Sequence, residues 1–258
     1  MILLLGGTTE ATSIANALAE AGFEVLLSTS TSIPPRGALR PGIRQRTGEL
    51  DRRGLADLIR TQKIGIVIDA THPYAAAISI NACSACQQTG ITYVSLDRPS
   101  AVTNAPDILW ATDHDRAATL AVSFGQPVLL TIGVRNLAPY AAAARSRGIQ
   151  LVARILDHPS SVETCRRLGL KAEQIVRANG PFSVTENALL IARHQIGVLV
   201  TKDSGNAGGV GNKIAAARDS GCRIVVVKRP PRPQPGYSSI SALMDAVRRC
   251  VPSPSLFS

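Results

Sequence analysis

The chain opens with a short apolar run, Ile2–Leu5, that stops at Gly6-Gly7. Apolar residues then recur at helical spacing over Ala11–Leu18, and Gly22 follows as a stop. A strand, a glycine turn and a helix form the opening unit of nucleotide-binding α/β domains. The pattern therefore predicts such a unit at the N-terminus.

Strand-like and helical patterns continue to alternate along the chain. In the first half we expect strands at 23–27, 43–46, 65–68 and 92–96, with helices at 51–59 and 74–89. From residue 127 the predicted strands are 127–132, 151–155, 174–177, 198–201 and 224–227, and the predicted helices are 136–147, 158–168, 183–194, 213–219 and 239–250. This α/β alternation predicts two Rossmann-like, doubly wound parallel-sheet domains.

A change of pattern after Asp97-Arg98 sets the predicted domain boundaries. We expect a first domain over 1–98, a connecting segment over 99–126, and a second α/β domain over 127–258. The connecting segment holds one strand pattern, 108–111, and one helix pattern, 115–124.

Composition supports this fold class and bears on the cellular compartment in which the protein is expected. Hydrophobic residues make up 45% of the 258 positions but aromatic residues only 3%, so the core is expected to be aliphatic, which suits parallel strands covered by helices. The sequence has neither an apolar run of membrane-span length nor the features of a signal peptide. We therefore expect a soluble cytoplasmic protein. Cys83 and Cys86 fall in a helical pattern and are interpreted as small packing residues.

The formal net charge of +10 predicts an anionic partner. The basic residues are scattered, and the few aromatic residues offer no stacking platform for single-stranded nucleic acid. The charge therefore favours a small, multiply charged anion over nucleic acid.

The glycine turn fits a dinucleotide fingerprint only in part. In G-x-G-x-x-G/A, Gly6 and Ala11 match, but Thr8 replaces the middle glycine. The turn could hold a phosphate at the start of the helix. It could equally be an ordinary strand–helix turn in which Thr8 caps the helix.

The end of the second predicted strand bears on the choice of cofactor. NAD-binding proteins usually carry an acidic residue there, whereas this chain has Ser28, Thr29, Ser30 and Thr31, with Arg36 nearby. Hydroxyl groups and a guanidinium suit a ribose 2′-phosphate, which favours NADPH. A solvated Ser/Thr loop is the alternative.

Other strand ends carry further candidates. Thr47-Gly48 ends the third strand, and Asp69-Ala70-Thr71-His72-Pro73-Tyr74 follows the fourth, where His72 could donate a proton or simply start a helix. In the second domain Lys202-Asp203-Ser204-Gly205 precedes more glycines and Lys213, a pattern that suits an anion but also a flexible turn.

An ordered set of motifs resembles the precorrin-6A reductase family of cobalamin biosynthesis. The set runs along nearly the whole chain and comprises Gly6-Gly7-Thr8-Thr9-Glu10-Ala11, Asp69-Ala70-Thr71-His72-Pro73-Tyr74-Ala75, Gly180-Pro181-Phe182-Ser183 with Asn187, and Thr201-Lys202-Asp203-Ser204-Gly205 with Gly208-Gly209 and Lys213.

The resemblance implies NADPH-dependent reduction of one double bond of precorrin-6A to give precorrin-6B, in two domains that flank a cleft. The substrate is an anionic tetrapyrrole, and no nucleic-acid, membrane or metal partner is implied; a monomeric state is compatible with the sequence. For the cofactor we expect Gly6, Gly7, Thr8, Thr9, Glu10, Ser28, Thr29, Ser30, Arg36, Thr47, Gly48, Thr71 and His72.

For the substrate carboxylates we expect Arg135, Arg154, Ser183, Lys202, Ser204, Gly205 and Lys213. The proton could come from His72, Tyr74, Asp203 or water. The alternatives are a cobalt-precorrin-6A reductase of the anaerobic pathway, a different NADPH-dependent reductase, a non-catalytic nucleotide- or tetrapyrrole-binding module, and a nucleic-acid-binding protein.

Overall fold

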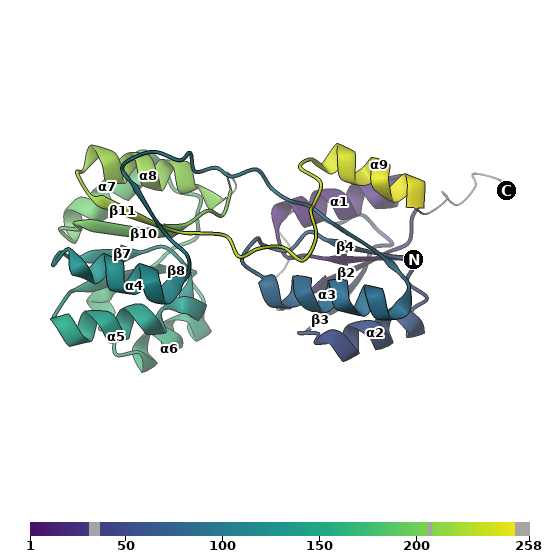
Figure 1. Cartoon of the computed structure of the whole chain (residues 1–258), viewed down its shortest axis with the longest axis horizontal. Coiled ribbons are helices and arrows are strands. Elements are labelled where there is room, and N and C mark those ends of the chain that lie inside the picture. The colour runs from purple at the N-terminus through teal and green to yellow at the C-terminus, as the bar shows by residue number, and fades with distance from the viewer. Residues whose placement is uncertain (31–36, 206–207, 251–258) are drawn as a thin grey trace. The chain divides into compact units, whose positions relative to one another are not determined.

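A computed structural model describes residues 1–30, 37–205 and 208–250. The chain divides into two compact units. The first unit comprises Met1–Pro99 and Pro230–Ser258, and the second comprises Ser100–Arg229. The chain therefore passes from one unit to the other twice (Figure 1).

The first unit is built on a parallel sheet with the strand order β3-β2-β1-β4-β5 among its described residues. Figure 1 labels β2, β3 and β4 of this sheet. Order 3-2-1-4-5 is that of the classical dinucleotide-binding fold, and the order reverses between β1 and β4. The strands and helices of this unit are β1 (Ile2–Leu5), β2 (Val25–Thr29), β3 (Arg44–Thr47), β4 (Ile66–Asp69), β5 (Thr92–Ser95), α1 (Thr9–Glu20), α2 (Arg52–Thr61), α3 (Ala76–Thr89) and α9 (Ile240–Cys250).

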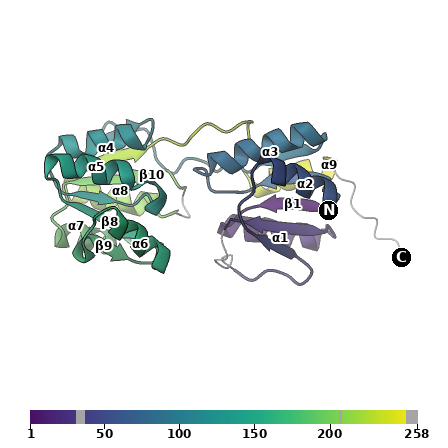
Figure 2. The ribbon, with the colours of Figure 1, turned by 90° about the horizontal axis from the view of Figure 1, so that it is seen from below.

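Helices cover both faces of this sheet (Figure 2). On one face, α1 and α9 bury their apolar residues against Ile2 and Leu4 of β1. On the other face, α2 and α3 pack against Leu3 and Leu5, and Cys83 belongs to this core. The alternation of Ile2–Leu5 between two covered faces explains why the strand is a continuous apolar run.

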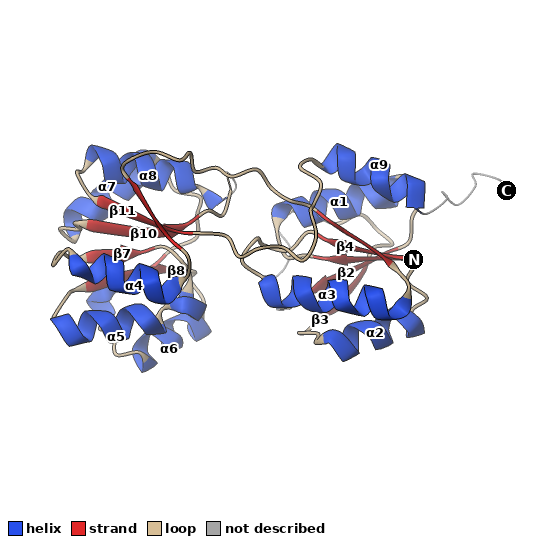
Figure 3. Ribbon diagram, viewed as in Figure 1, coloured by secondary structure: helices blue, strands red, loops and turns tan. Residues whose placement is uncertain are grey.

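The second unit holds a parallel sheet with the order β6-β11-β10-β7-β8-β9 in the part of the chain that is described. Figure 3 labels its strands β11, β10, β7 and β8. The strand order reverses between β7 and β10. The elements are β6 (Ile108–Ala111), β7 (Val128–Leu130), β8 (Leu151–Ile155), β9 (Ile175–Arg177), β10 (Val198–Lys202), β11 (Arg223–Val227), α4 (His114–Ser123), η1 (Val134–Asn136), α5 (Ala138–Arg147), α6 (Pro159–Arg167), η2 (Ala172–Gln174), α7 (Val184–Arg193) and α8 (Val210–Asp219).

The structure confirms two Rossmann-like parallel-sheet domains, but it divides the chain at points other than those expected. The segment expected to be a connector supplies β6, which pairs with β11 in the second sheet. The final helix, expected in the second domain, packs in the first, and Tyr237 forms a bridge to Leu96 of that unit. Both differences arise from contacts between distant parts of the chain, which local periodicity does not encode.

Most predicted elements match the structure to within a few residues, and one difference affects a candidate site. Helix α8 begins at Val210 rather than at Lys213, so Lys213 lies inside its first turns. None of the helices within the described ranges combines the length and apolar character of a membrane span.

Candidate active site

In the first unit, the candidate residues gather at the carboxyl edge of the sheet, where β1 and β4 end side by side. Ligands of open α/β sheets bind at such a switch point. Gly6 is tightly enclosed, because a Cβ atom at this position would lie 2.3 Å from the Cβ atom of Ala11. Gly7 is exposed, and a Cβ atom there would meet nothing within 4 Å. Gly6 therefore allows close packing of the turn against α1, and there is open space beside Gly7.

Thr8 caps helix α1 rather than presenting its hydroxyl group outward. Its Oγ1 atom accepts a hydrogen bond from the amide of Ala11 at 3.3 Å and donates to the carbonyl oxygen of Ala70 at 3.3 Å. The guanidinium of Arg98 also donates to Thr8 Oγ1, at 2.9 Å. The capping interpretation thus describes the side chain, and any anion at the turn would meet the backbone amides of the helix start. Thr9, the first residue of α1, is exposed.

Arg98 is a structural residue of this edge that the sequence did not suggest. Its guanidinium donates to the Glu10 carboxylate at 3.0 Å and to the carbonyl oxygens of Thr71 at 2.8 Å and Ala70 at 3.1 Å. Burial alone would raise the pKa of Glu10, but a hydrogen bond from its own backbone amide and the adjacent Arg98 outweigh this and lower it. Arg98 therefore ties the glycine turn to the end of β4. Its position just after β5 is the only sequence signal for this role.

The segment after β4 is fixed by Asp69, whose side chain is fully buried. The carboxylate accepts hydrogen bonds from the hydroxyl groups of Thr71 at 2.6 Å, Ser79 at 2.5 Å and Tyr93 at 2.7 Å. Arg232, in the returning segment, approaches it at 3.4 Å. Burial and the Asp69 charge raise the pKa of Tyr93, so its hydroxyl group stays protonated.

His72 and Tyr74 lie together after this network. The backbone amide of Tyr74 donates to Nδ1 of His72 at 3.3 Å, and the two rings lie 5.6 Å apart. An Nδ1 atom that accepts a hydrogen bond carries no proton. In the neutral imidazole, the proton is therefore on Nε2.

The remaining cofactor candidates lie along the same edge, on β2 and β3. Ser28 is buried at the end of β2, Thr29 is half-buried, and Ser30 is exposed. Thr47 ends β3, and the amide of Gly48 donates to the carbonyl oxygen of Thr29 at 2.9 Å. Arg36 lies outside the described residues.

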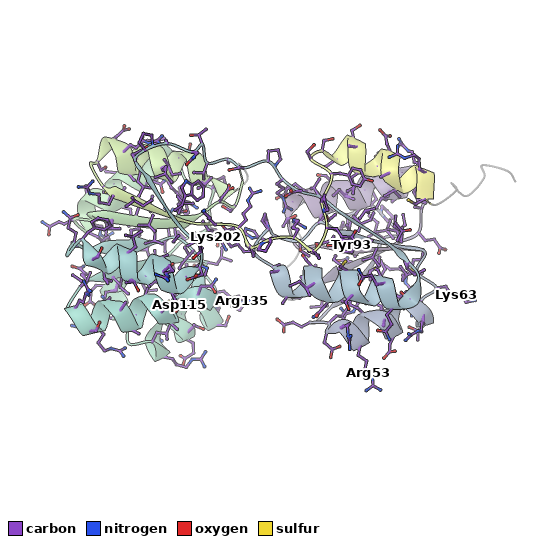
Figure 4. All side chains as sticks on the ribbon, in the orientation of Figure 1. Arg53, Lys63, Tyr93, Asp115, Arg135 and Lys202 are labelled. Atoms are coloured by element: carbon purple, nitrogen blue, oxygen red, sulfur yellow. The ribbon has the colours of Figure 1, made fainter. Side chains whose placement is uncertain are left out.

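In the second unit, the basic residues Arg135 and Lys202 follow or end the neighbouring strands β7 and β10 (Figure 4). Lys202 ends β10, and Arg135 lies in η1 after β7. Burial lowers the pKa of Lys202, and the nearby charge of Arg135 lowers it further. The two cations are therefore close enough to repel each other.

Lys213 and Arg154 extend this group of cations. Burial lowers the pKa of Lys213 to about 8, with further contributions from the charges of Arg154 and Lys202. Lys213 Nζ donates to the carbonyl oxygen of Gly208 at 2.9 Å. The four residues Arg135, Arg154, Lys202 and Lys213 are called the cationic group below.

Arg154 is the most informative member of the cationic group, because it is buried. Its Nη1 atom donates to Asn187 at 2.9 Å, and its guanidinium lies 4.1 Å from the centre of the Phe182 ring. Burial lowers its pKa to about 10. Its Nη2 atom is buried and has no hydrogen-bond partner among the described residues. A buried donor without a partner is costly, so a ligand anion would suit this position.

Two other candidates of the second unit, Ser183 and Asp203, make contacts that stabilise the fold. The Ser183 hydroxyl forms a capping box with Glu186 at the start of α7. Asp203 is buried, accepts from the amide of Ala101 at 3.1 Å, and pairs with Arg229 at 2.9 Å. These contacts favour a structural role for Asp203 over proton donation. Ser204 is half-buried next to the buried Gly205, whose φ angle is +78°.

Two parallel sheets, each with polar residues at its switch point, define the class of Rossmann-like α/β proteins. Within that class, residues 1–248 match the model of the precorrin-6x reductase family CbiJ/CobK. The chain belongs to this family, which confirms the resemblance found in the sequence, and it is accordingly a reductase.

Individual relatives agree with this assignment. The chain is 30% identical to a cobalt-precorrin-6A reductase of Priestia megaterium over 231 residues, covering 89% of this chain and 91% of the relative. It is 36% identical to a precorrin-6A reductase of a Sinorhizobium species over 232 residues, covering 88% and 84%. A solved structure of the CobK precorrin-6A reductase matches with a TM-score of 0.79 at 30% identity, covering 98% of each chain. Membership of a reductase family implies a nicotinamide cofactor.

Proposed function

We propose that this chain is a precorrin-6A reductase of cobalamin biosynthesis that takes its reducing equivalents from NADPH and gives precorrin-6B. The observation that carries the proposal is the cationic group, placed at a switch point in a chain of the CbiJ/CobK family. Precorrins carry many carboxylates, and a group of cations that includes a buried guanidinium with an unpartnered Nη2 atom suits such a substrate.

The first unit supplies the features that a dinucleotide needs. The space beside Gly7 and the amides at the start of α1 fit a diphosphate, and helix dipole and amides together favour an anion there. When bound, reduced nicotinamide supplies a hydride. We assign Gly6, Glu10 and Thr71 to shaping this site, and the backbone amides of Gly7 and Thr9, both exposed residues, to contacting it.

The second unit would hold the macrocycle through the cationic group. Arg154 would donate from Nη2, while Asn187 and the Phe182 ring keep its guanidinium in place. Lys213 would reach the substrate from α8, and Ser204 and Gly205 would line the same edge. Ser183 would act indirectly, because it fixes the start of the helix that carries Asn187.

Reduction of a double bond also needs a proton. We assign this role to His72, with Tyr74 as the alternative, because the contact from the Tyr74 amide leaves a donor on Nε2 of His72. Asp203 is the weaker candidate, because Arg229 and the amide of Ala101 already engage its carboxylate.

Absorbance of reduced nicotinamide tests the proposal directly. We expect the full chain to consume NADPH only when precorrin-6A is present, with slower consumption of NADH. Consumption that requires cobalt-precorrin-6A would instead favour the anaerobic pathway, since relatives of both names match this chain. Binding of NADPH and tetrapyrrole without oxidation would indicate a non-catalytic module and would exclude the proposed reaction.

A further inference from the structure

The adjacent strands β1, β2 and β3 end at the same edge of the sheet of the first unit. Arg46 of β3 therefore lies beside the position expected for the 2′-phosphate. Leu5 of β1 is in register with Ser28 of β2, and Ser28 is in register with Arg46 of β3. Neighbouring strands are about 4.8 Å apart. Arg46 therefore lies two strands from the glycine turn, beside Ser28, the residue before the last of β2.

Arg46 is held in place by the protein and still has hydrogen-bonding capacity. Its Nη1 atom donates to the Ser28 hydroxyl at 2.9 Å and to the carbonyl oxygen of Gly48 at 2.9 Å, and Nη2 donates to that of Thr47 at 3.3 Å. A guanidinium has five N–H donors. Within the described ranges these contacts use three of them. The side chain is only half-buried, so its charge remains accessible to a ligand.

Gly48 leaves room for this guanidinium. Its φ angle is +119°, a conformation that favours glycine, and a Cβ atom there would lie 3.3 Å from Arg46 Nη2. A larger residue at this position would be strained and would crowd the side chain. The turn after β3 is thus compatible with an arginine that folds back toward β2.

Ser28 links Arg46 to the glycine turn. Its backbone carbonyl oxygen accepts from the amide of Gly6 at 3.0 Å, so the two strand ends are joined directly. Its Oγ atom accepts from Arg46, which leaves the hydroxyl proton to point elsewhere. A phosphate oxygen beside Arg46 could accept a hydrogen bond from that hydroxyl group.

The charge around Ser28 favours a dianion over two free hydroxyl groups. NAD-binding proteins place a carboxylate at the end of β2, where this chain has Ser28. The nearest described acidic residue along β3 and its turn is the exposed Glu49, and Asp51 further on caps α2 through Gly54 at 2.7 Å. Arg46 thus faces a hydroxyl group at the position where a carboxylate would neutralise it.

We propose that Arg46 determines the preference for NADPH over NADH by binding the ribose 2′-phosphate, with the Ser28 hydroxyl as a second donor. This inference rests on the proposed use of a nicotinamide dinucleotide by the first unit. It adds a residue that the sequence pattern did not single out, because Arg46 lies on the neighbouring strand rather than after β2.

Calorimetric titration of the full chain with NADPH, NADH and adenosine 2′,5′-bisphosphate tests the inference. We expect R46Q to weaken NADPH and bisphosphate binding by about ten- to a hundredfold and NADH binding by less than about threefold, as expected for loss of charge-assisted hydrogen bonds. R46K, which keeps the charge but not the planar guanidinium, should lie between R46Q and the unaltered chain.

R44Q is the matched control. Arg44 lies two residues earlier on the same strand and face, and its guanidinium contacts Gln62 at 2.9 Å, farther from the carboxyl edge. R44Q removes the same charge and should change the NADPH affinity by less than about threefold, since distant surface charges are screened.

The outcomes separate this inference from the proposed function. Equal weakening of NADPH and NADH binding by R46Q would mean that Arg46 only supports the turn, and would overturn the inference alone. Equal weakening of NADPH binding by R44Q and R46Q would overturn it as well, since it would indicate a general charge effect. Failure of the unaltered chain to bind either dinucleotide would overturn the inference together with the proposed cofactor.

Discussion

At the scale of single residues, burial and like charge give the second unit its chemical character. Lys213 is a lysine whose pKa falls to about 8, because burial disfavours the ammonium ion and because Arg154 and Lys202 lie nearby. An anion bound among these groups would remove the repulsion and stabilise the charged form. The cationic group is therefore destabilised in the absence of a ligand and is suited to bind one.

This shift predicts a pH dependence of substrate binding. Lys213 is protonated below pH 8 and loses its proton above it, so the KM for the tetrapyrrole should rise by about tenfold or more well above pH 8. The KM for NADPH should stay constant, because its proposed site is in the first unit. Initial rates measured on either side of pH 8 provide the test.

The variant K213R is the control for this pH dependence. Arginine stays charged throughout the range, so the KM for the tetrapyrrole should remain flat. If K213R showed the same rise as the unaltered chain, another group would be responsible for the pH dependence.

At the scale of elements, the glycine turn shows two adjacent glycines with different roles. Gly6 allows α1 to pack closely against the end of β1, because any Cβ atom would overlap Ala11. Gly7 has no such neighbour, and its exposure leaves the start of α1 open to a ligand. Glycine at position 6 thus permits close packing, whereas glycine at position 7 leaves space for a ligand.

This difference predicts that alanine substitution lowers stability at Gly6 and lowers NADPH affinity at Gly7. G6A should destabilise the chain by about 1–3 kcal/mol through overpacking, whereas G7A should change stability by less than about 0.5 kcal/mol. Thermal unfolding followed by calorimetry measures the first effect. G7A should weaken NADPH binding even though the chain remains stable. Equal loss of stability in both variants would contradict the assigned roles.

At the scale of the whole molecule, the C-terminal helix belongs to the N-terminal unit. Leu243, Met244 and Val247 of α9 are buried in the core formed by α1 and β1. The first unit is therefore completed only after the chain has passed through the second. Helix α1, which begins at the proposed cofactor site, therefore packs in the same core as residues from the other end of the sequence.

Truncation of a buried residue of α9 tests this organisation. L243A should cost about 2–5 kcal/mol, as for other buried leucines, and should speed amide hydrogen exchange in β1 and α1 but not in β10. I191A provides the matched control, since Ile191 lies in the core of the second unit. Faster exchange in β10 after L243A would support the domain boundary expected from the sequence.

The sequence predicted the candidate site in part, and the missing residues have a common cause. The strand ends with their glycines and hydroxyl groups, from Gly6 to Ser28, are local features, and the structure has them at the carboxyl ends of β1 and β2. Arg98 and Arg46 were missed, because their importance comes from contacts with residues on other strands. Thr8 is a case in which the local sequence is sufficient. Its position before the helix suggests an N-cap, and its side chain does cap α1.

The sequence by itself determined the α/β fold class, the order of the elements and the family, because hydrophobic periodicity and short motifs are properties of neighbouring residues. Only the tertiary structure decided which strands are adjacent, that α9 completes the first unit, and which cations gather around Arg154. These features depend on burial and on contacts between residues far apart in the chain. Charge and hydrogen-bonding capacity acquire their effect only when such residues are brought together.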